Sequence, residues 1–161
     1  MNSRKILIFA FLISGTVLFS QPTEMVDLEE KYKLNEIGVS NGTVYFTNSS
    51  EFAYGFHLHY TRSIRDTNFG FGLSFGHIFD DHGHTSLGLV ASYEPVKKWV
   101  LGVSPGIVFE HQDFSKGEIA IHADFTYEFS INQFHLGPAV EFAAHHGDYH
   151  LGVGLHLGYG F

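Results

Sequence analysis

Cysteine is absent from the 161-residue chain, and basic residues are scarce beside acidic ones. Without cysteine there can be no disulfide framework, no thiolate metal site and no lipid-modified amino-terminal cysteine. Lys and Arg number 9 against 17 Asp and Glu, which gives a formal net charge of −8. An acidic chain of this kind is a poor candidate for nucleic-acid binding, so no nucleic-acid partner is expected.

Long apolar runs are also missing, apart from a short one close to the start. Arg4 and Lys5 precede an apolar run of about a dozen residues, and small or polar residues follow it up to Ser20. This is the layout of a secretory signal peptide, and the run falls short of the ~20 apolar residues that a spanning helix needs. We therefore expect residues 1–20 to be a signal peptide and residues 21–34 to be a periplasmic lead-in.

Helical periodicity is missing beyond about Glu36, where apolar and polar residues alternate in short segments. Alternation with a period of two predicts half-buried strands, and short polar connectors predict antiparallel hairpins. One domain is expected, over residues 35–161. The expected strands are 35–47, 51–63, 67–79, 84–94, 98–110, 116–130, 132–145 and 148–161. A change of parity at Asn41 and Gly42 predicts a bulge or a turn in the first strand.

The two faces of each strand differ in bulk as well as in polarity. In the last strand Leu151 and Val153 share one face, whereas Gly152, Gly154 and His156 share the other. An eight-stranded barrel has room inside for only a modest set of side chains, so the bulky apolar face must point outward. Such a face needs lipid around it. The pattern therefore predicts an all-β fold, an antiparallel up-and-down transmembrane β-barrel of eight strands.

Aromatic residues form two bands on the expected outward face if the first strand rises from the periplasm. The periplasmic band comprises Tyr60, Phe69, Tyr93, Trp99, Tyr127, Phe129, Phe134, Tyr159 and Phe161. The strand centres carry Leu73, Leu89, Val103, Ile121, Val140, Val153 and Leu155. The other rim carries Phe52, Tyr54, Phe79, Phe109, Phe142 and Tyr149. The order aromatic, aliphatic, aromatic is typical of a bilayer span.

The last strand ends in alternating apolar residues that include Tyr159 and Phe161. It resembles the carboxy-terminal insertion signal of bacterial outer-membrane barrels, and residues 35–161 resemble the OmpX and OmpA transmembrane-domain families. The stretch "LFSQ" at residues 18–21 is similar to the signal-peptide end of Bacteroidetes exported proteins. The resemblance implies a monomer in the outer membrane of a Gram-negative bacterium, contacting outer-membrane lipid, with both termini periplasmic. It also implies insertion by the barrel-assembly machinery, and it brings no functional motif.

Histidine is abundant, with 12 in the chain, and it gathers with aspartate near the three connectors expected to be extracellular. Loops of one barrel converge on one rim, and neutral imidazole with carboxylate suits Zn, Cu or Ni better than Ca or Mg. The candidate metal ligands are His82, His84, His111, His145, His146, His150, Asp80, Asp81 and Asp148. Two other interpretations stay open. One is a solvated rim without a ligand, since no segment has a closed ligand spacing. The other is a response to pH through clustered histidines.

Five further histidines fall on the inward face, together with several carboxylates. They are His57, His59, His122, His135 and His156, and the carboxylates are Glu110, Asp124, Glu128 and Glu141. Buried polar groups must be paired, so we expect a hydrogen-bonded plug that fills the barrel. A proton or ion path is the alternative, and it is disfavoured because eight strands leave no open aqueous lumen.

An enzymatic function is the weakest of the interpretations. His84 and Ser86 stand two residues apart, a spacing that resembles the Ser and His of outer-membrane lipid A deacylases. Alternation turns Ser86 inward, away from lipid, and no acidic partner for the histidine is evident. Glycine-rich stretches such as "FGFG" lie inside strands, so no phosphate-binding loop and no certain cofactor are expected. The sequence thus favours a non-enzymatic barrel with a metal-binding rim, then a structural or partner-docking barrel without a ligand, then a lipid-modifying hydrolase.

Overall fold

The computed structural model describes residues 34–81, 83–110, 113–146 and 148–161. The expected signal peptide and all but the last residue of the expected lead-in lie outside the described residues. The strands are β1 (Asn35–Phe46), β2 (Glu51–Ser63), β3 (Phe69–Phe79), β4 (Thr85–Val96), β5 (Trp99–Phe109), β6 (Gly117–Tyr127), β7 (Phe129–Ile131), β8 (Phe134–His145) and β9 (Asp148–Gly160). The described part of the chain contains no helix long and apolar enough to cross a membrane.

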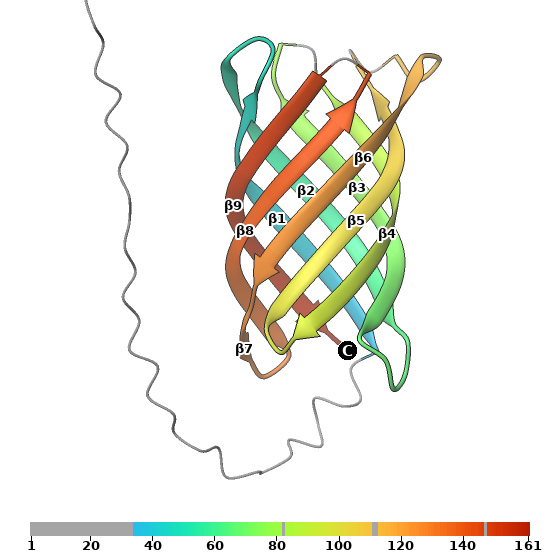
Figure 1. Cartoon of the computed structure of the whole chain (residues 1–161), viewed down its shortest axis with the longest axis vertical. Helices are drawn as coiled ribbons and strands as arrows, with labels where there is room; N and C mark the ends of the chain where they lie inside the picture. Colours follow the sequence, from blue (N-terminus) through green and yellow to red (C-terminus); the bar gives the residue numbers. More distant parts are fainter. Residues whose placement is uncertain (1–33, 82, 111–112, 147) are drawn as a thin grey trace, which may run out of the picture.

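The strands form one antiparallel sheet that closes on itself (Figure 1). Its order is β6-β5-β4-β3-β2-β1-β9-β8-β7, and β8 also pairs with β6. β6 and β7 both pair with β8 and are separated only at Glu128. Together they make one interrupted strand, so the barrel has eight strands. The predicted fold is confirmed, and the predicted strands agree with the observed ones to within a few residues.

The predicted orientation of the two faces is also confirmed. The outward aliphatic side chains at mid-strand are largely exposed, with Leu73 61%, Leu89 63% and Val153 66% exposed. The inward positions of the last strand, among them His150 and His156, are buried. The protein therefore presents its apolar surface to its surroundings and its polar surface to its own interior.

The bulge or turn predicted in the first strand is wrong. β1 pairs residue by residue with both β2 and β9 through Asn41 and Gly42. The pattern changes there because Asn41 points outward, whereas Val44 and Phe46 point inward and pack with Ile78. Near the Phe46 end of β1 the inward face becomes apolar and the outward face carries polar residues, while the backbone pairing continues without a break.

The barrel has two ends, which we call the terminal rim and the distal rim. The terminal rim holds Asn35, Phe161 and the turns that follow β2, β4 and β7, and the distal rim holds the connections that follow β1, β3, β5 and β8 (Figure 1). At the terminal rim, Asn35 and Phe161 donate backbone hydrogen bonds to each other at 3.0 and 2.8 Å and so join β1 to β9.

Ring contacts connect the aromatic residues at each rim. The terminal rim has the pairs Phe69–Tyr93, Trp99–Tyr127, Tyr127–Phe129, Phe134–Tyr159 and Tyr159–Phe161. The distal rim has the pairs Tyr45–Phe52, Tyr54–Phe79, Phe109–Phe114 and Phe142–Tyr149. The two aromatic bands predicted from the sequence therefore lie at opposite ends of the barrel.

Candidate metal centres

The interior is built from rows of facing residues in which a large side chain lies beside a very small one. One row runs across four strands as His59, Gly38, Gly158 and His135. A Cβ atom on Gly158 would overlap the Nε2 atom of His135, and one on Gly38 would overlap the His59 ring. These two glycines thus create the space that the imidazoles occupy.

The first group of possible ligands lies at the distal rim, and we call it the distal cluster: His84, Glu110 and His145. One ligand atom from each lies within 4.8 Å of the others. The Nε2 atom of His84 is 3.4 Å from Oε1 of Glu110, and the His84 and His145 rings are 5.5 Å apart. Both ring nitrogens of His145 are buried and make no hydrogen bond within the described structure. Two imidazoles and one exposed carboxylate are therefore available to a metal ion at the mouth of the barrel.

Asp80 orients the His84 ring from the other side. Its Oδ2 atom is 2.8 Å from Nδ1 of His84, while its Oδ1 atom accepts hydrogen bonds from the backbone amides of Gly83 and His84. Partial burial favours the neutral acid. The neighbouring His84 and the two amides outweigh burial and hold the pKa of Asp80 below its usual value. A carboxylate fixed in this way holds Nδ1 as the donor and leaves Nε2 directed at Glu110.

The second group, the middle cluster, comprises His122, Glu141 and His150. The Nδ1 atom of His122 is 2.9 Å from Oε1 of Glu141. Ala143 of β8 faces His122 on one side and His150 on the other, and it is fully buried between them. Its small side chain lets the two rings approach to 5.8 Å.

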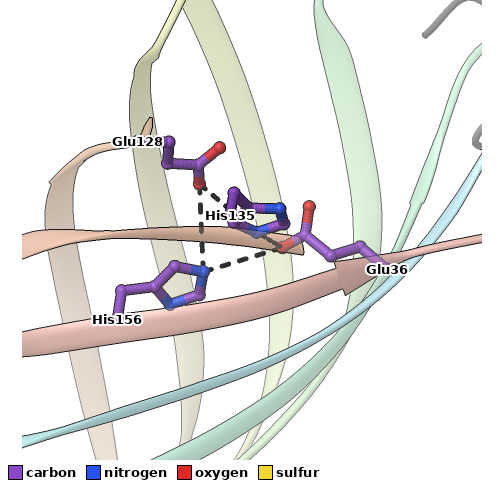
Figure 2. A group of neighbouring side chains, drawn as sticks. All are labelled: Glu36, Glu128, His135 and His156. Atoms are coloured by element: carbon purple, nitrogen blue, oxygen red, sulfur yellow. Dashed lines mark ion pairs between the residues drawn. The ribbon is translucent and has the colours of Figure 1, made fainter. Parts of the chain in front are cut away.

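The third group, the terminal cluster, comprises Glu36, Glu128, His135 and His156 (Figure 2). In Figure 2 both glutamates and both imidazoles point toward a common centre. They come from β1, β8, β9 and the break between β6 and β7 at Glu128. The Nε2 atom of His135 is 3.4 Å from Oε1 of Glu36 and 3.7 Å from Oε1 of Glu128. The Nε2 atom of His156 is 4.0 and 3.9 Å from the same two oxygens.

Imidazole rings connect the three clusters along the barrel. Successive ring centroids lie 5.2 to 6.4 Å apart from His135 through His156, His59, His57, His122, His150 and His145 to His84. The inward placement predicted for His57, His59, His122, His135 and His156 is confirmed.

The structure brings together only part of the predicted rim. His84 and His145 meet, and Asp80 supports His84. His150 also points inward and groups with His122 and Glu141, and its ring lies 6.4 Å from that of His145. Of the remaining candidates, Asp81 and His146 are exposed, and Asp148 accepts a hydrogen bond from the amide of Tyr149. His82 and His111 lie outside the described residues.

The predicted metal ligands include no residue of the terminal cluster, and they lack Glu110 of the distal cluster and His122 and Glu141 of the middle cluster. Glu110 was placed on the inward face but not among the rim ligands, and Glu36 was not singled out at all. Both could have been found from alternation, since Glu36 shares the parity of Gly38 and Ser40 in β1. The terminal cluster could not, because it depends on how β1, β8 and β9 are aligned.

His84 has an acidic partner, Asp80, that the sequence did not indicate, but His84 and Ser86 are not arranged as the base and nucleophile of a hydrolase. Ser86 points inward, where a Cβ atom on Gly76 would overlap its hydroxyl oxygen. The two ring nitrogens of His84 face Asp80 and Glu110, not Ser86. The orientation of both side chains therefore favours the non-enzymatic interpretation.

No protein-family model and no curated protein matches the sequence. Solved structures do match. Ail, the attachment invasion locus protein of Yersinia pestis, aligns with a TM-score of 0.52 and 14% identity over 79% of this chain and 97% of Ail. Neisserial surface protein A aligns with a TM-score of 0.58 and 9% identity over 79% of this chain and 96% of its own. A de novo designed transmembrane barrel aligns with a TM-score of 0.56 and 14% identity over 78% of this chain and 95% of its own.

The chain has the fold of the small eight-stranded outer-membrane β-barrels. This confirms the resemblance that the sequence suggested, at the level of architecture. The expected Bacteroidetes origin gains no support from these structures. At identities of 9 to 14% the likeness concerns the fold, so function must be argued from the interior and the rims of this chain.

Proposed function

We propose that the chain is an integral, non-enzymatic protein of the outer membrane of a Gram-negative bacterium, with the terminal rim toward the periplasm. Three observations support the location: the closed barrel, the exposed aliphatic side chains at mid-strand, and an aromatic band at each rim. A barrel whose outward face carries Leu73, Leu89 and Val153 is stable where lipid covers that face.

We propose further that the distal rim binds a divalent transition-metal ion, Zn, Cu or Ni, through His84, Glu110 and His145. The observation that carries this proposal is the approach of these three ligand atoms to within 4.8 Å of one another. They come from the connection after β3, the connection after β5, and the end of β8 where the connection to β9 begins. The orienting contact from Asp80 supports it, because metal-binding histidines usually donate their second ring nitrogen to a carboxylate. Three protein ligands leave one position open, as in sites that exchange or deliver their ion.

Calorimetric titration of the refolded chain in detergent with Zn, Cu and Ni tests the rim. We expect the double variant His84→Ala/His145→Ala to bind one ion fewer than the unmodified chain. His146→Ala is the matched control, since this exposed histidine of the same connection belongs to none of the three clusters. An unchanged number of bound ions in the double variant would refute the rim site.

A chain that binds no ion at the rim would be a structural or partner-docking barrel without a ligand there. Within this second function the short connections argue against a large adhesin surface, since binding platforms on small barrels are usually built from long loops. For assembly, we propose that the barrel-assembly machinery recognises β9 through Tyr159 and Phe161. Both residues are exposed to the surroundings and stack on each other at the terminal rim. We expect the assembled barrel to be a monomer in contact with outer-membrane lipid.

A further inference from the structure

The terminal cluster lies deep in the other half of the barrel and shares no residue with the distal cluster. His156 is 2% exposed and His135 is 9% exposed. We propose that Glu36, Glu128, His135 and His156 form a second site for a divalent transition-metal ion, with zinc as the best fit.

The spacing of the four ligand atoms is close to that of a tetrahedral zinc site. Zinc binds histidine nitrogen at about 2.0–2.1 Å and carboxylate oxygen at about 2.0–2.2 Å. In a regular tetrahedron with such bonds the ligands are about 3.3–3.6 Å apart. The four nitrogen-to-oxygen distances are 3.4, 3.7, 3.9 and 4.0 Å. Contraction of these four distances by a few tenths of an ångström would bring them into the tetrahedral range, and the nitrogen–nitrogen and oxygen–oxygen pairs lie within 4.8 Å.

A hydrogen-bond partner is already in place behind one of the ligands. The Oγ atom of Ser40 lies 3.0 Å from Nδ1 of His156. When Nδ1 donates its proton to Ser40, the lone pair of His156 is on Nε2, the atom that faces the two glutamates. Nε2 of His156 is buried and makes no hydrogen bond within the described structure.

Electrostatics favours a cation at the same point. Two carboxylates that face each other inside a barrel are costly unless an opposite charge accompanies them. His59 also approaches Glu36, at 3.2 Å, and its ring stacks on His156 at 5.2 Å. A divalent ion held by Glu36 and Glu128 would neutralise both charges, and His59 would hold Glu36 in position.

The site is accessible from the terminal rim. A cavity of about 150 Å³ is lined by Glu36, Glu128 and His156, and also by Thr67, Asn68 and Glu94. Thr67 and Asn68 belong to the turn after β2, and Glu94 lies near the terminal end of β4. Most of the lining residues are polar, although Phe69, Val90 and Val100 also contribute, so an ion can enter from the periplasmic side without passing the distal cluster.

The experiment measures the number and the geometry of bound ions on the refolded full chain, with zinc chloride and cobalt(II) chloride as probes. We expect two ions on the unmodified chain and one on His84→Ala/His145→Ala. We also expect one on Glu128→Gln/His156→Gln, and none on the combined variant. Cobalt in the terminal cluster should show the intense visible absorption of tetrahedral coordination, with nitrogen and oxygen ligands only.

Each outcome bears on one site. Loss of the rim ion alone supports the distal site and says nothing against the terminal one, so the two proposals fail separately. If Glu128→Gln/His156→Gln binds as many ions as the unmodified chain, the terminal cluster is a hydrogen-bonded plug and the proposal is wrong. Should that variant not fold, Ser40→Ala replaces it. It keeps all four ligands, and in the His84→Ala/His145→Ala chain we expect it to weaken zinc binding by about 10–100-fold.

Discussion

The Nδ1 atom of His122 and the Oε1 atom of Glu141 lie 2.9 Å apart on the paired strands β6 and β8. Both side chains are largely buried, at 12% and 24% exposed. Glu141→Ala would leave His122 without this acceptor inside the barrel, so we expect the free energy of unfolding to fall by about 1–3 kcal/mol.

Urea unfolding in lipid vesicles with a chelator present measures this loss apart from any metal effect. Asp81→Ala is the control, because this exposed aspartate should change the free energy of unfolding by less than about 0.5 kcal/mol. Equal stability of the two variants would mean that the buried contact contributes nothing.

The outward position of Leu89 tests the membrane location. Leu89 faces Leu73 on the neighbouring strand at mid-height, and both are exposed. We expect Leu89→Arg to destabilise the barrel in vesicles by about 2–4 kcal/mol, because the arginine would lie near the bilayer centre. Phe52→Arg at the distal rim should cost about 0–1 kcal/mol. A similar small cost at both positions would contradict the proposed bilayer span.

Asp80 should affect metal binding at the rim without touching the ion. Asp80→Asn removes the carboxylate that fixes His84, so we expect the affinity of the distal cluster to fall by about 10–100-fold. Titration of the variant alongside Asp81→Asn measures the difference. An Asp80→Asn chain that binds with unchanged affinity would show that His84 needs no such support.

Gly158 offers a test of the terminal cluster that removes no ligand. An alanine there would overlap Nε2 of His135, the end of a side chain that can move aside. We expect Gly158→Ala to fold, to displace the His135 ring and to weaken the tetrahedral cobalt spectrum. Asp81→Ala in the connection after β3 is the contrasting variant, since this exposed residue belongs to none of the three clusters.

Asp113 gives a prediction on pH for the connection after β5. The Ser115 hydroxyl and amide donate to its Oδ1 atom at 2.6 and 3.1 Å and lower the pKa of Asp113. A lowered pKa means that these bonds stabilise the connection above the ordinary pKa of aspartate and are lost as pH falls through the folded value. Ser115→Ala should raise the pKa of Asp113 toward its ordinary value in an NMR titration. An unchanged pKa would count against the assigned donors.

Alternation alone predicted the strands, the direction of each face and the two aromatic bands, because these depend on the period of two within one strand. It failed where polarity and position disagree. Asn41 faces outward although it is polar, and Val44 faces inward although it is apolar, so an unbroken strand looked like a bulge. Predictions from polarity are therefore weakest where the interior is not uniformly polar.

The clusters depend on alignment between strands, which the sequence of a single strand does not specify. His150 was assigned to the rim because it follows a histidine-rich connection only a few residues away. Its partner in the fold is His122, with Ala143 between them, and these three residues come from three strands. For the same reason, the convergence of Glu36 with His135 and His156 can be identified only from the register between β1, β9 and β8.

The hydrogen bonds between Asn35 and Phe161 join residues 126 positions apart. The other pairings join strands that follow each other in the chain, apart from β6 with β8, which are separated only by the short β7. Closing the seam between β1 and β9 therefore costs the most loop entropy. Until it closes, β1 and β9 expose unpaired edges that invite aggregation. The seam is thus the expected rate-limiting step of folding, and terminal-cluster ligands from both of its edges, Glu36 and His156, are brought together only when it is complete.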